Sequence, residues 1–214
     1  KNIEKVLNDS HYIMGEEVKE LEEKLAKYVG RKYCVTCGNG TDALTLAMRV
    51  LDVKEGDAVF VPTFTFYSSA EVISLEGATP IFVDVNETFN MDAKKLEKAI
   101  EQVKSEGKLN LKAIVAVDLF GQTANFPEIL EIANKYGLKV VEDAAQGFGG
   151  SISGKKACSF GDISTTSFFP AKPLGCYGDG GAVFTDDEEM YQLLLWFAVC
   201  CPQNMPVYRK RGEL

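Results

Sequence analysis

The chain has 214 residues, and 46% of them are hydrophobic, which is enough for one substantial buried core. Its 31 acidic and 23 basic residues leave a net charge of −8, so the sequence argues against nucleic acid as a partner. The longest apolar stretch is far shorter than the roughly 20 residues of a membrane helix, and no signal-peptide pattern is recognisable. We therefore expect a cytoplasmic globular protein with no nucleic-acid and no membrane partner.

Helical and strand patterns alternate along the chain, and glycine, proline or an acidic cap marks most of their ends. In chain order the patterns predict helix 16–28, strand 32–37, helix 41–51, strand 58–61, helix 65–76, strand 80–85, helix 92–106, strand 113–117, helix 127–136, strand 138–141, strand 163–169 and strand 181–185. After Gly147 the loops become rich in glycine, and such loops on a rigid scaffold commonly carry function.

The expected fold class is α/β. Continuously apolar strands joined by helices imply a mostly parallel sheet with helices on both faces, which is a three-layer α/β/α sandwich. Polar residues follow the ends of several strands, at 38–41, 62–66, 118 and 142–146. In open α/β sheets this carboxyl edge holds the ligand, so we expect the site there.

The segment Gly-Asn-Gly-Thr at 38–41 lies between a predicted strand and a predicted helix. Free amides at the helix N-terminus and the Thr41 hydroxyl could hold a phosphate, although an ordinary tight turn can have the same sequence. The spacing Gly-x-Gly-x-x-Ala at 38–43 also fits the looser dinucleotide fingerprint of nicotinamide or flavin enzymes. That alternative calls for an acid after the next strand, whereas the chain has Pro-Thr-Phe-Thr at 62–65.

Asp143 ends a predicted apolar strand, where an ionised carboxylate is costly without a cationic partner. A protonated pyridine nitrogen would be such a partner, and a carboxylate that caps the following segment is the alternative. Lys172 lies between Pro170 and Pro173 in an apolar setting. Burial disfavours the charged ammonium, and the neutral amine is the form that attacks an aldehyde, whereas a solvated loop lysine is the plain alternative.

Cysteine and histidine usage argues against metal chemistry. Cys34 and Cys37 form a C-x-x-C, but residues three apart on a strand face opposite sides, so we expect reduced packing residues and no metal site. His11 is the single histidine and is expected at the surface, which disfavours a Ser-His-Asp triad.

Six motifs follow one another in the chain: Gly-Asn-Gly-Thr-Asp-Ala-Leu at 38–44, Val-Pro-Thr-Phe-Thr-Phe at 61–66, Val-Glu-Asp-Ala-Ala-Gln at 141–146, Ser-Phe-Gly-Asp at 159–162, Ser-Phe-Phe-Pro-x-Lys at 167–172 and Gly-Asp-Gly-Gly-Ala at 178–182. Together they closely resemble the DegT/DnrJ/StrS family of nucleotide-sugar aminotransferases, which use pyridoxal 5'-phosphate (PLP) and have fold type I. The resemblance covers about residues 15–187.

The resemblance implies a role for seven residues. Lys172 matches the lysine that forms the Schiff base with PLP and then carries the proton, and Asp143 matches the carboxylate that faces the pyridine nitrogen; these two are the expected catalytic residues. The other cofactor-binding residues implied are Gly40, Thr41 and Ser167 at the phosphate, Phe66 stacked on the ring and Gln146 near the ring oxygen. A core phenylalanine is the alternative for Phe66.

The implied reaction transfers an amino group, with glutamate as the expected donor, to a nucleotide-linked keto-sugar in polysaccharide or glycan synthesis. A dehydratase branch of the family has histidine in place of the lysine, so Lys172 favours an aminotransferase. Relatives often have histidine where this chain has Asp118, a difference that bears on substrate preference. A truncated PLP-binding remnant without full activity and a Rossmann-type oxidoreductase are the alternatives.

Members of the family are longer, and their C-terminal small domain has no counterpart after about residue 185. We therefore expect a PLP-binding large domain over residues 1–190 and a truncated or atypical segment over 191–214. Apolar surface left by an absent domain favours association, so we expect a homodimer.

Overall fold

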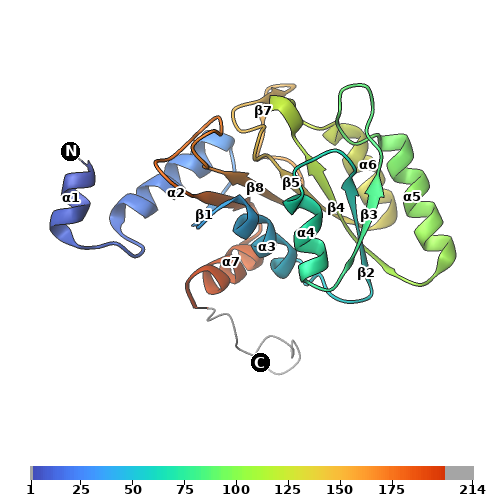
Figure 1. The fold of residues 1–214 in the computed structure, drawn as a ribbon, viewed down its shortest axis with the longest axis horizontal. Coiled ribbons are helices and arrows are strands. Elements are labelled where there is room, and N and C mark those ends of the chain that lie inside the picture. The colour runs from blue at the N-terminus through green and yellow to red at the C-terminus, as the bar shows by residue number, and fades with distance from the viewer. Residues whose placement is uncertain (1, 201–214) are drawn as a thin grey trace.

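The computed structural model describes residues 2–200, which form a central seven-stranded sheet with helices packed on it (Figure 1). The strands of this sheet are β1 (Tyr33–Cys37), β2 (Asp57–Pro62), β3 (Thr79–Val83), β4 (Asn110–Val117), β5 (Lys139–Asp143), β8 (Ile163–Ser167) and β9 (Gly181–Thr185). A small two-stranded sheet pairs β6 (Ser151–Ile152) with β7 (Lys155–Lys156). The helices are α1 (Asn2–Asp9), α2 (Glu16–Val29), α3 (Gly40–Val50), α4 (Ser68–Leu75), α5 (Ala93–Glu106), η1 (Leu119–Gly121), α6 (Phe126–Tyr136) and α7 (Glu188–Cys200).

The strand order is β1-β9-β8-β5-β4-β2-β3. Neighbours from β8 through to β3 pair in parallel, whereas β9 runs antiparallel to both β1 and β8. The carboxyl ends of the parallel strands therefore meet at one edge, and the polar segments that follow them gather there. The predicted mostly parallel sheet is confirmed.

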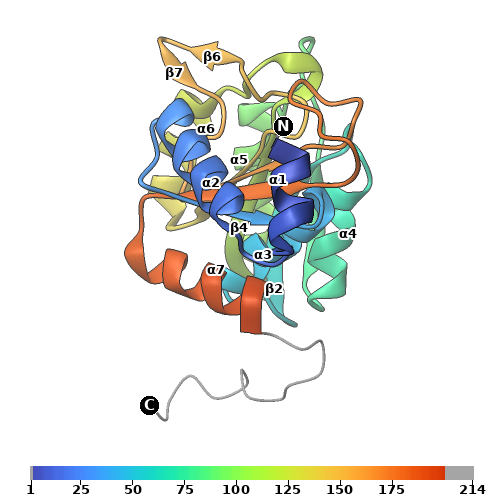
Figure 2. The same ribbon diagram turned by 90° about the vertical axis from the view of Figure 1, so that its left-hand side faces the viewer.

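Helices cover both faces of the sheet, as the apolar strands require (Figures 1 and 2). One core cluster joins α3, α4 and α7 to one face, and two further clusters join α5, α6 and α2 to the other. The expected three-layer α/β/α sandwich is thus what the chain forms.

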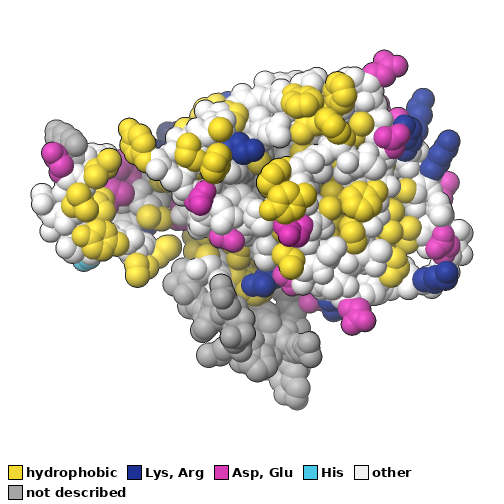
Figure 3. Space-filling model, in the orientation of Figure 1, with side chains coloured by type: hydrophobic (Ala, Val, Ile, Leu, Met, Phe, Trp, Pro, Cys, Tyr) yellow, Lys and Arg dark blue, Asp and Glu magenta, His cyan; other side chains and the backbone are white. Residues whose placement is uncertain are grey.

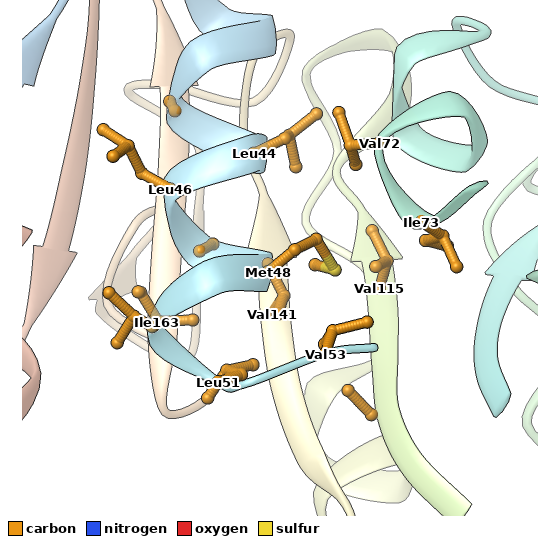
Figure 4. Close-up of a cluster of buried hydrophobic side chains, with 14 of the residues drawn as sticks. Leu44, Leu46, Met48, Leu51, Val53, Val72, Ile73, Val115, Val141 and Ile163 are labelled. Atoms are coloured by element: carbon orange, nitrogen blue, oxygen red, sulfur yellow. The ribbon is translucent and has the colours of Figure 1, made fainter. Parts of the chain in front are cut away.

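Helix α3 is the centre of the first layer. Figure 4 shows Leu44 of this helix directed toward Val72 of α4, and Met48 directed toward Val115 of β4 and Val141 of β5. Met48 and Ile73 are completely buried. Burial of such side chains is worth about 1.5–3 kcal/mol each, and it fixes the N-terminus of α3 at the carboxyl edge of the sheet.

Several elements differ from the sequence-based expectation: α1, β6, β7, η1 and α7 were not predicted, and the strands expected at 80–85 and 163–169 end at residues 83 and 167. The helix expected from residue 65 begins at Ser68, because residues 63–67 first form a loop in which the carbonyl of Phe66 accepts from the N–H of Ser69 at 3.2 Å. Helix α7 is a further element of the first layer, in which its Leu194 is completely buried. Residues 201–214, most of the expected atypical segment, lie outside the described residues.

In residues 2–200 no helix is both long enough and apolar enough to span a membrane.

Candidate active site

Four loops meet at the carboxyl edge of the sheet, and each carries at least one of the residues singled out from the sequence. They follow β1, β2, β5 and β8 and comprise residues 38–41, 63–67, 144–147 and 168–176. Parallel pairing of β2, β4, β5 and β8 aligns three of these loops, and α3 connects the first loop to the same edge.

The turn before α3 lets the start of this helix come close to the end of strand β8. Asn39 caps the helix, since its Oδ1 accepts from the N–H of Asp42 at 2.8 Å. A Cβ on Gly40 would lie 2.7 Å from the Cβ of Ser167, so the two residues touch although they are far apart in sequence. The Thr41 hydroxyl lies 2.9 Å from that of Ser68. Hydroxyl groups and the positive end of the α3 dipole therefore gather at one point, as an anion requires.

Asp143 ends β5 with its carboxylate buried, at 5% exposure, on the face that α3 and α4 cover. Its Oδ2 accepts from the Ser69 hydroxyl at 2.9 Å, and its Oδ1 accepts from the N–H of Ala145 at 3.1 Å. Burial raises the pKa of Asp143, while these two hydrogen bonds and the positive charge of Lys172 oppose the rise. A further cation at this carboxylate would stabilise its ionised form.

Lys172 lies in a compact loop at the same edge. Its N–H donates to the carbonyl of Phe169 at 2.8 Å, and a Cβ on Gly175 would lie 2.5 Å from the carbonyl oxygen of Pro170, so the loop folds back on itself. The side chain is half-buried, and its charge reaches Asp143. The apolar setting expected for Lys172 is only partly found, because Phe169 and Leu174 are exposed.

Phe66 and Gln146 occupy the rim of this edge. Phe66 is 59% exposed with its ring 4.6 Å from that of Tyr67, so it is not the core phenylalanine that the sequence left open. The Oε1 of Gln146 accepts from the N–H of Phe120 at 3.2 Å. An exposed ring is free to pack against a flat ligand.

Ser68 and Ser69 were missed by sequence reasoning, although both are buried and touch residues of the candidate site. The Ser69 hydroxyl also lies 3.1 Å from that of Thr65. The signal was available: two adjacent serines follow the Pro-Thr-Phe-Thr-Phe motif at the start of a helix. Only the packing of α4 on α3 shows that they face the site.

The remaining residues considered from the sequence are the cysteines, His11 and Asp118. Cys34 and Cys37 face the α2 layer and the α3 layer respectively, and burial raises the pKa of Cys37 to about 12. No group of potential metal ligands occurs in residues 2–200, and His11 is exposed. Asp118, which we expected to bear on substrate preference, is 0% exposed and cannot touch a substrate.

The fold and this edge define a class: an α/β protein whose parallel sheet carries, at its carboxyl edge, a buried aspartate, a half-buried lysine and a close approach of a helix N-terminus to a strand. The chain belongs to the DegT/DnrJ/EryC1/StrS aminotransferase family, whose model matches residues 1–211.

Relatives of known name or structure agree with this assignment. The UDP-2-acetamido-2-deoxy-3-oxo-D-glucuronate aminotransferase of Pseudomonas aeruginosa is 50% identical over 189 residues, which are 88% of this chain and 51% of that protein. The crystal structure of a DegT DnrJ EryC1 StrS aminotransferase from Brucella abortus is 48% identical with a TM-score of 0.89, over 91% of this chain and 52% of that one. The E. coli GDP-4-keto-6-deoxy-D-mannose-3-dehydratase with bound hydrated PLP is 32% identical with a TM-score of 0.82, over 90% of this chain and 49% of that one.

The fold therefore matches fold type I aminotransferases, as predicted. The chain spans about half the length of the curated relatives it matches. The dinucleotide-binding alternative has no support, because the loop after β2 contains no carboxylate.

Proposed function

We propose that this chain is the cofactor-binding part of a PLP-dependent aminotransferase that passes an amino group, with glutamate as donor, to a nucleotide-linked keto-sugar. The observation that carries the proposal is the placement of Lys172 and the buried Asp143 beside the cradle formed by Gly40 and Ser167. Residues 1–190, with α7 packed on them, are proposed as the PLP-binding domain of a cytoplasmic protein.

The residues present fit PLP. Asp143 is buried with a raised pKa, so a protonated pyridine nitrogen would give its carboxylate the cation that the protein supplies only in part through Lys172. A ring held in this way supplies an electron sink for bonds broken next to the substrate nitrogen.

The anion cradle fits the phosphate group. Gly40 and Thr41 begin α3, where N–H groups lack partners within the helix, and the hydroxyls of Thr41 and Ser167 add donors. The Gly40 to Ser167 contact leaves no room for a larger side chain at position 40. In the proposal these three residues hold the phosphate and so fix the distance from α3 to the reacting end of the ring.

The remaining residues orient the ring and move the proton. Phe66 would pack against one face of the ring, and Gln146 would contact its oxygen. Lys172 would supply the amine that holds the cofactor and, as a free amine, would take up and return a proton at its Nζ. A lysine in this place favours amino transfer over dehydration.

A labelling experiment tests the proposal. Purified protein is mixed with PLP, reduced with borohydride and digested, and mass spectrometry is expected to find the adduct on the peptide that contains Lys172. Lys172→Ala is expected to abolish the adduct, whereas Lys98→Ala, which removes an exposed lysine on α5, is expected to leave it unchanged. No adduct on Lys172 in the unaltered protein contradicts the proposal.

Turnover separates an active enzyme from a PLP-binding remnant. The loaded protein is incubated with glutamate alone, and loss of the absorbance of the lysine-bound cofactor reports the first half-reaction. A chain that forms the adduct on Lys172 but does not respond to glutamate, or to any other amino donor, is the remnant.

A further inference from the structure

A buried carboxyl group next to the candidate site lacks a partner in its ionised form. Asp118 directly follows β4, and its side chain is 0% exposed. Its Oδ1 accepts from the N–H of Ala124 at 2.9 Å, but no group of residues 2–200 donates to its Oδ2. A buried oxygen without a hydrogen-bond donor destabilises the fold. A proton on the Asp118 carboxyl group removes this cost, because the protonated oxygen can itself donate a hydrogen bond.

Glu142 is the group that accepts a hydrogen bond from the protonated Asp118. Ala116 pairs with Glu142 in the parallel register of β4 and β5, so Asp118, two residues further on, projects from the same face of the sheet as Glu142. The two carboxyl groups lie within hydrogen-bonding reach of each other. Glu142 is also 0% exposed.

Glu142 already has the donors that a carboxylate needs. Its Oε1 accepts from the N–H of Cys158 at 2.6 Å, and its Oε2 accepts from the N–H of Phe160 at 2.7 Å and from the Ser164 hydroxyl at 2.8 Å. These hydrogen bonds favour the ionised form of Glu142. Asp118 has a single such donor, so the shared proton belongs on Asp118.

The charges near Asp118 also favour its protonated form. Burial and the negative charges of Glu142 and Asp143 raise the pKa of Asp118 well above its usual range, and the Ala124 N–H opposes them. Ionising both members of a buried carboxyl pair is the costly state.

The other titratable groups nearby do not neutralise Asp118. Burial raises the pKa of the Cys158 thiol, which therefore faces the pair in its neutral form. The guanidinium of Arg31 is hydrogen-bonded to Ser164 at 3.1 Å, on the far side of Glu142, and the charge of Lys172 acts on Asp143.

Asp118 lies under the turn that follows Asp143 and carries Gln146. Its N–H donates to the carbonyl of Asp143 at 2.9 Å. A Cβ on Gly147 would lie 2.3 Å from the Cβ of Asp118, so the turn over residues 144–147 rests directly on this side chain. The neighbouring Phe120 donates its N–H to the Oε1 of Gln146 at 3.2 Å.

We propose that Asp118 is a positioning residue whose carboxyl group stays protonated and donates a hydrogen bond to Glu142, and which thereby holds the turn that follows Asp143 and carries Gln146. The positioning half rests on the proposed function, whereas the proton itself can be measured without any cofactor.

The first experiment detects the proton. Infrared difference spectra of Asp118→Asn against the unaltered protein, both without PLP, are expected to show the loss of one carbonyl band of a protonated carboxylic acid near neutral pH. Asparagine keeps the Oδ1 acceptor and supplies an N–H to Glu142, so the variant is expected to fold. No loss of such a band overturns the proposal whether or not PLP binds.

Stability against pH gives an independent measure. A carboxyl group whose pKa is raised by folding contributes most to the free energy of unfolding below its unfolded pKa of about 3.9. That contribution is lost as pH rises through the raised pKa of the folded state. The unfolding equilibrium constant of the unaltered protein is therefore expected to rise relative to that of Asp118→Asn, by up to about tenfold per pH unit within this window. Parallel profiles for the two proteins contradict the proton assignment.

Cofactor affinity tests the positioning role. Near neutral pH Asp118→Asn is expected to bind PLP about as tightly as the unaltered protein, whereas Asp118→Ala, which leaves Glu142 without this donor, is expected to bind about tenfold more weakly or worse. At high pH the unaltered protein is expected to lose affinity relative to Asp118→Asn. Equal affinity in all three proteins at every pH overturns positioning by Asp118. Absence of PLP binding in all three, together with the loss of the infrared band, overturns the proposed function and leaves the proton in place.

Discussion

The carboxylate of Asp143 depends on a residue that no motif identified. The Ser69 hydroxyl donates to Asp143 Oδ2 and itself contacts Thr65, so α4 and the loop before it hold the aspartate in place. The other oxygen of Asp143 is held by the N–H of Ala145 within the same turn. Two segments that are distant in the chain therefore fix the orientation of the Asp143 carboxylate, which is expected to face the pyridine nitrogen.

Removing that hydroxyl tests the arrangement. Ser69→Ala is expected to weaken PLP binding by about tenfold to a hundredfold, because a hydrogen bond to a charged group is worth about 1.5–3 kcal/mol. Ser105→Ala, which removes a hydroxyl that donates to a carbonyl on the exposed side of α5, is the matched control and is expected to change nothing. The measurement is a fluorescence or absorbance titration with PLP. An unchanged dissociation constant for Ser69→Ala would show that Ser69 does not support Asp143.

Helix α3 and strand β8 form the anion cradle because their backbones approach closely. The missing side chain of Gly40 makes this possible, since a Cβ there would meet the Cβ of Ser167 at 2.7 Å. A comparable contact exists one strand further, where a Cβ on Gly181 would lie 2.4 Å from the carbonyl oxygen of Asn39. The turn at 38–41 is therefore held between α3, β8 and β9.

Gly40→Ala is expected to lower the free energy of unfolding by about 1 kcal/mol or more, because overpacking forces the helix away from the strand. It is also expected to weaken PLP binding, since the Ser167 hydroxyl moves with the strand. Gly178→Ala is the control: a Cβ at that position meets no atom within 4 Å. Urea unfolding and PLP titration of both variants make the comparison, and equal behaviour of the two would rule out close packing as the reason for glycine at position 40.

The whole molecule exposes an apolar surface at its N-terminal end. Helix α1 lies apart from the sheet in Figure 1, and Figure 3 shows hydrophobic side chains at that end of the molecule. None of its residues is buried: Ile3 is 61% exposed and Leu7 is 59% exposed. Such a surface is typical of a protein interface, and we propose that it contacts a second copy of the chain.

The homodimer has a direct test. Analytical ultracentrifugation of the protein is expected to give twice the chain mass, and the double variant Ile3→Glu, Leu7→Glu is expected to give a monomer with unchanged helix content. Phe82→Glu, at an exposed apolar position on the edge strand β3, is the control and is expected to stay dimeric. A dimeric double variant would exclude α1 from the interface, and a monomeric unaltered protein would exclude the homodimer.

The sequence by itself determined the class of fold and the order of most helices and strands, although α1, α7 and the β6–β7 pair were not predicted. Apolar strands such as 113–117 and helical spacing such as that of 16–28 are local patterns, and burial on both faces leaves few arrangements for them other than a parallel sheet between helices. The motifs that contain Lys172 and Asp143 were equally readable, because each is a short run of adjacent residues.

The tertiary structure alone decided which residues touch. The contacts from Ser69 to Asp143, from Gly40 to Ser167 and from Asp118 to Glu142 each join segments that are far apart in the chain. Local patterns show where a strand ends but not which neighbour lies across from its last side chain, since that depends on strand order and on the packing of α3 and α4. Asp118 is the clearest case. Its position directly after a strand predicted a side chain exposed at the edge of the sheet, whereas the turn over residues 144–147 buries it.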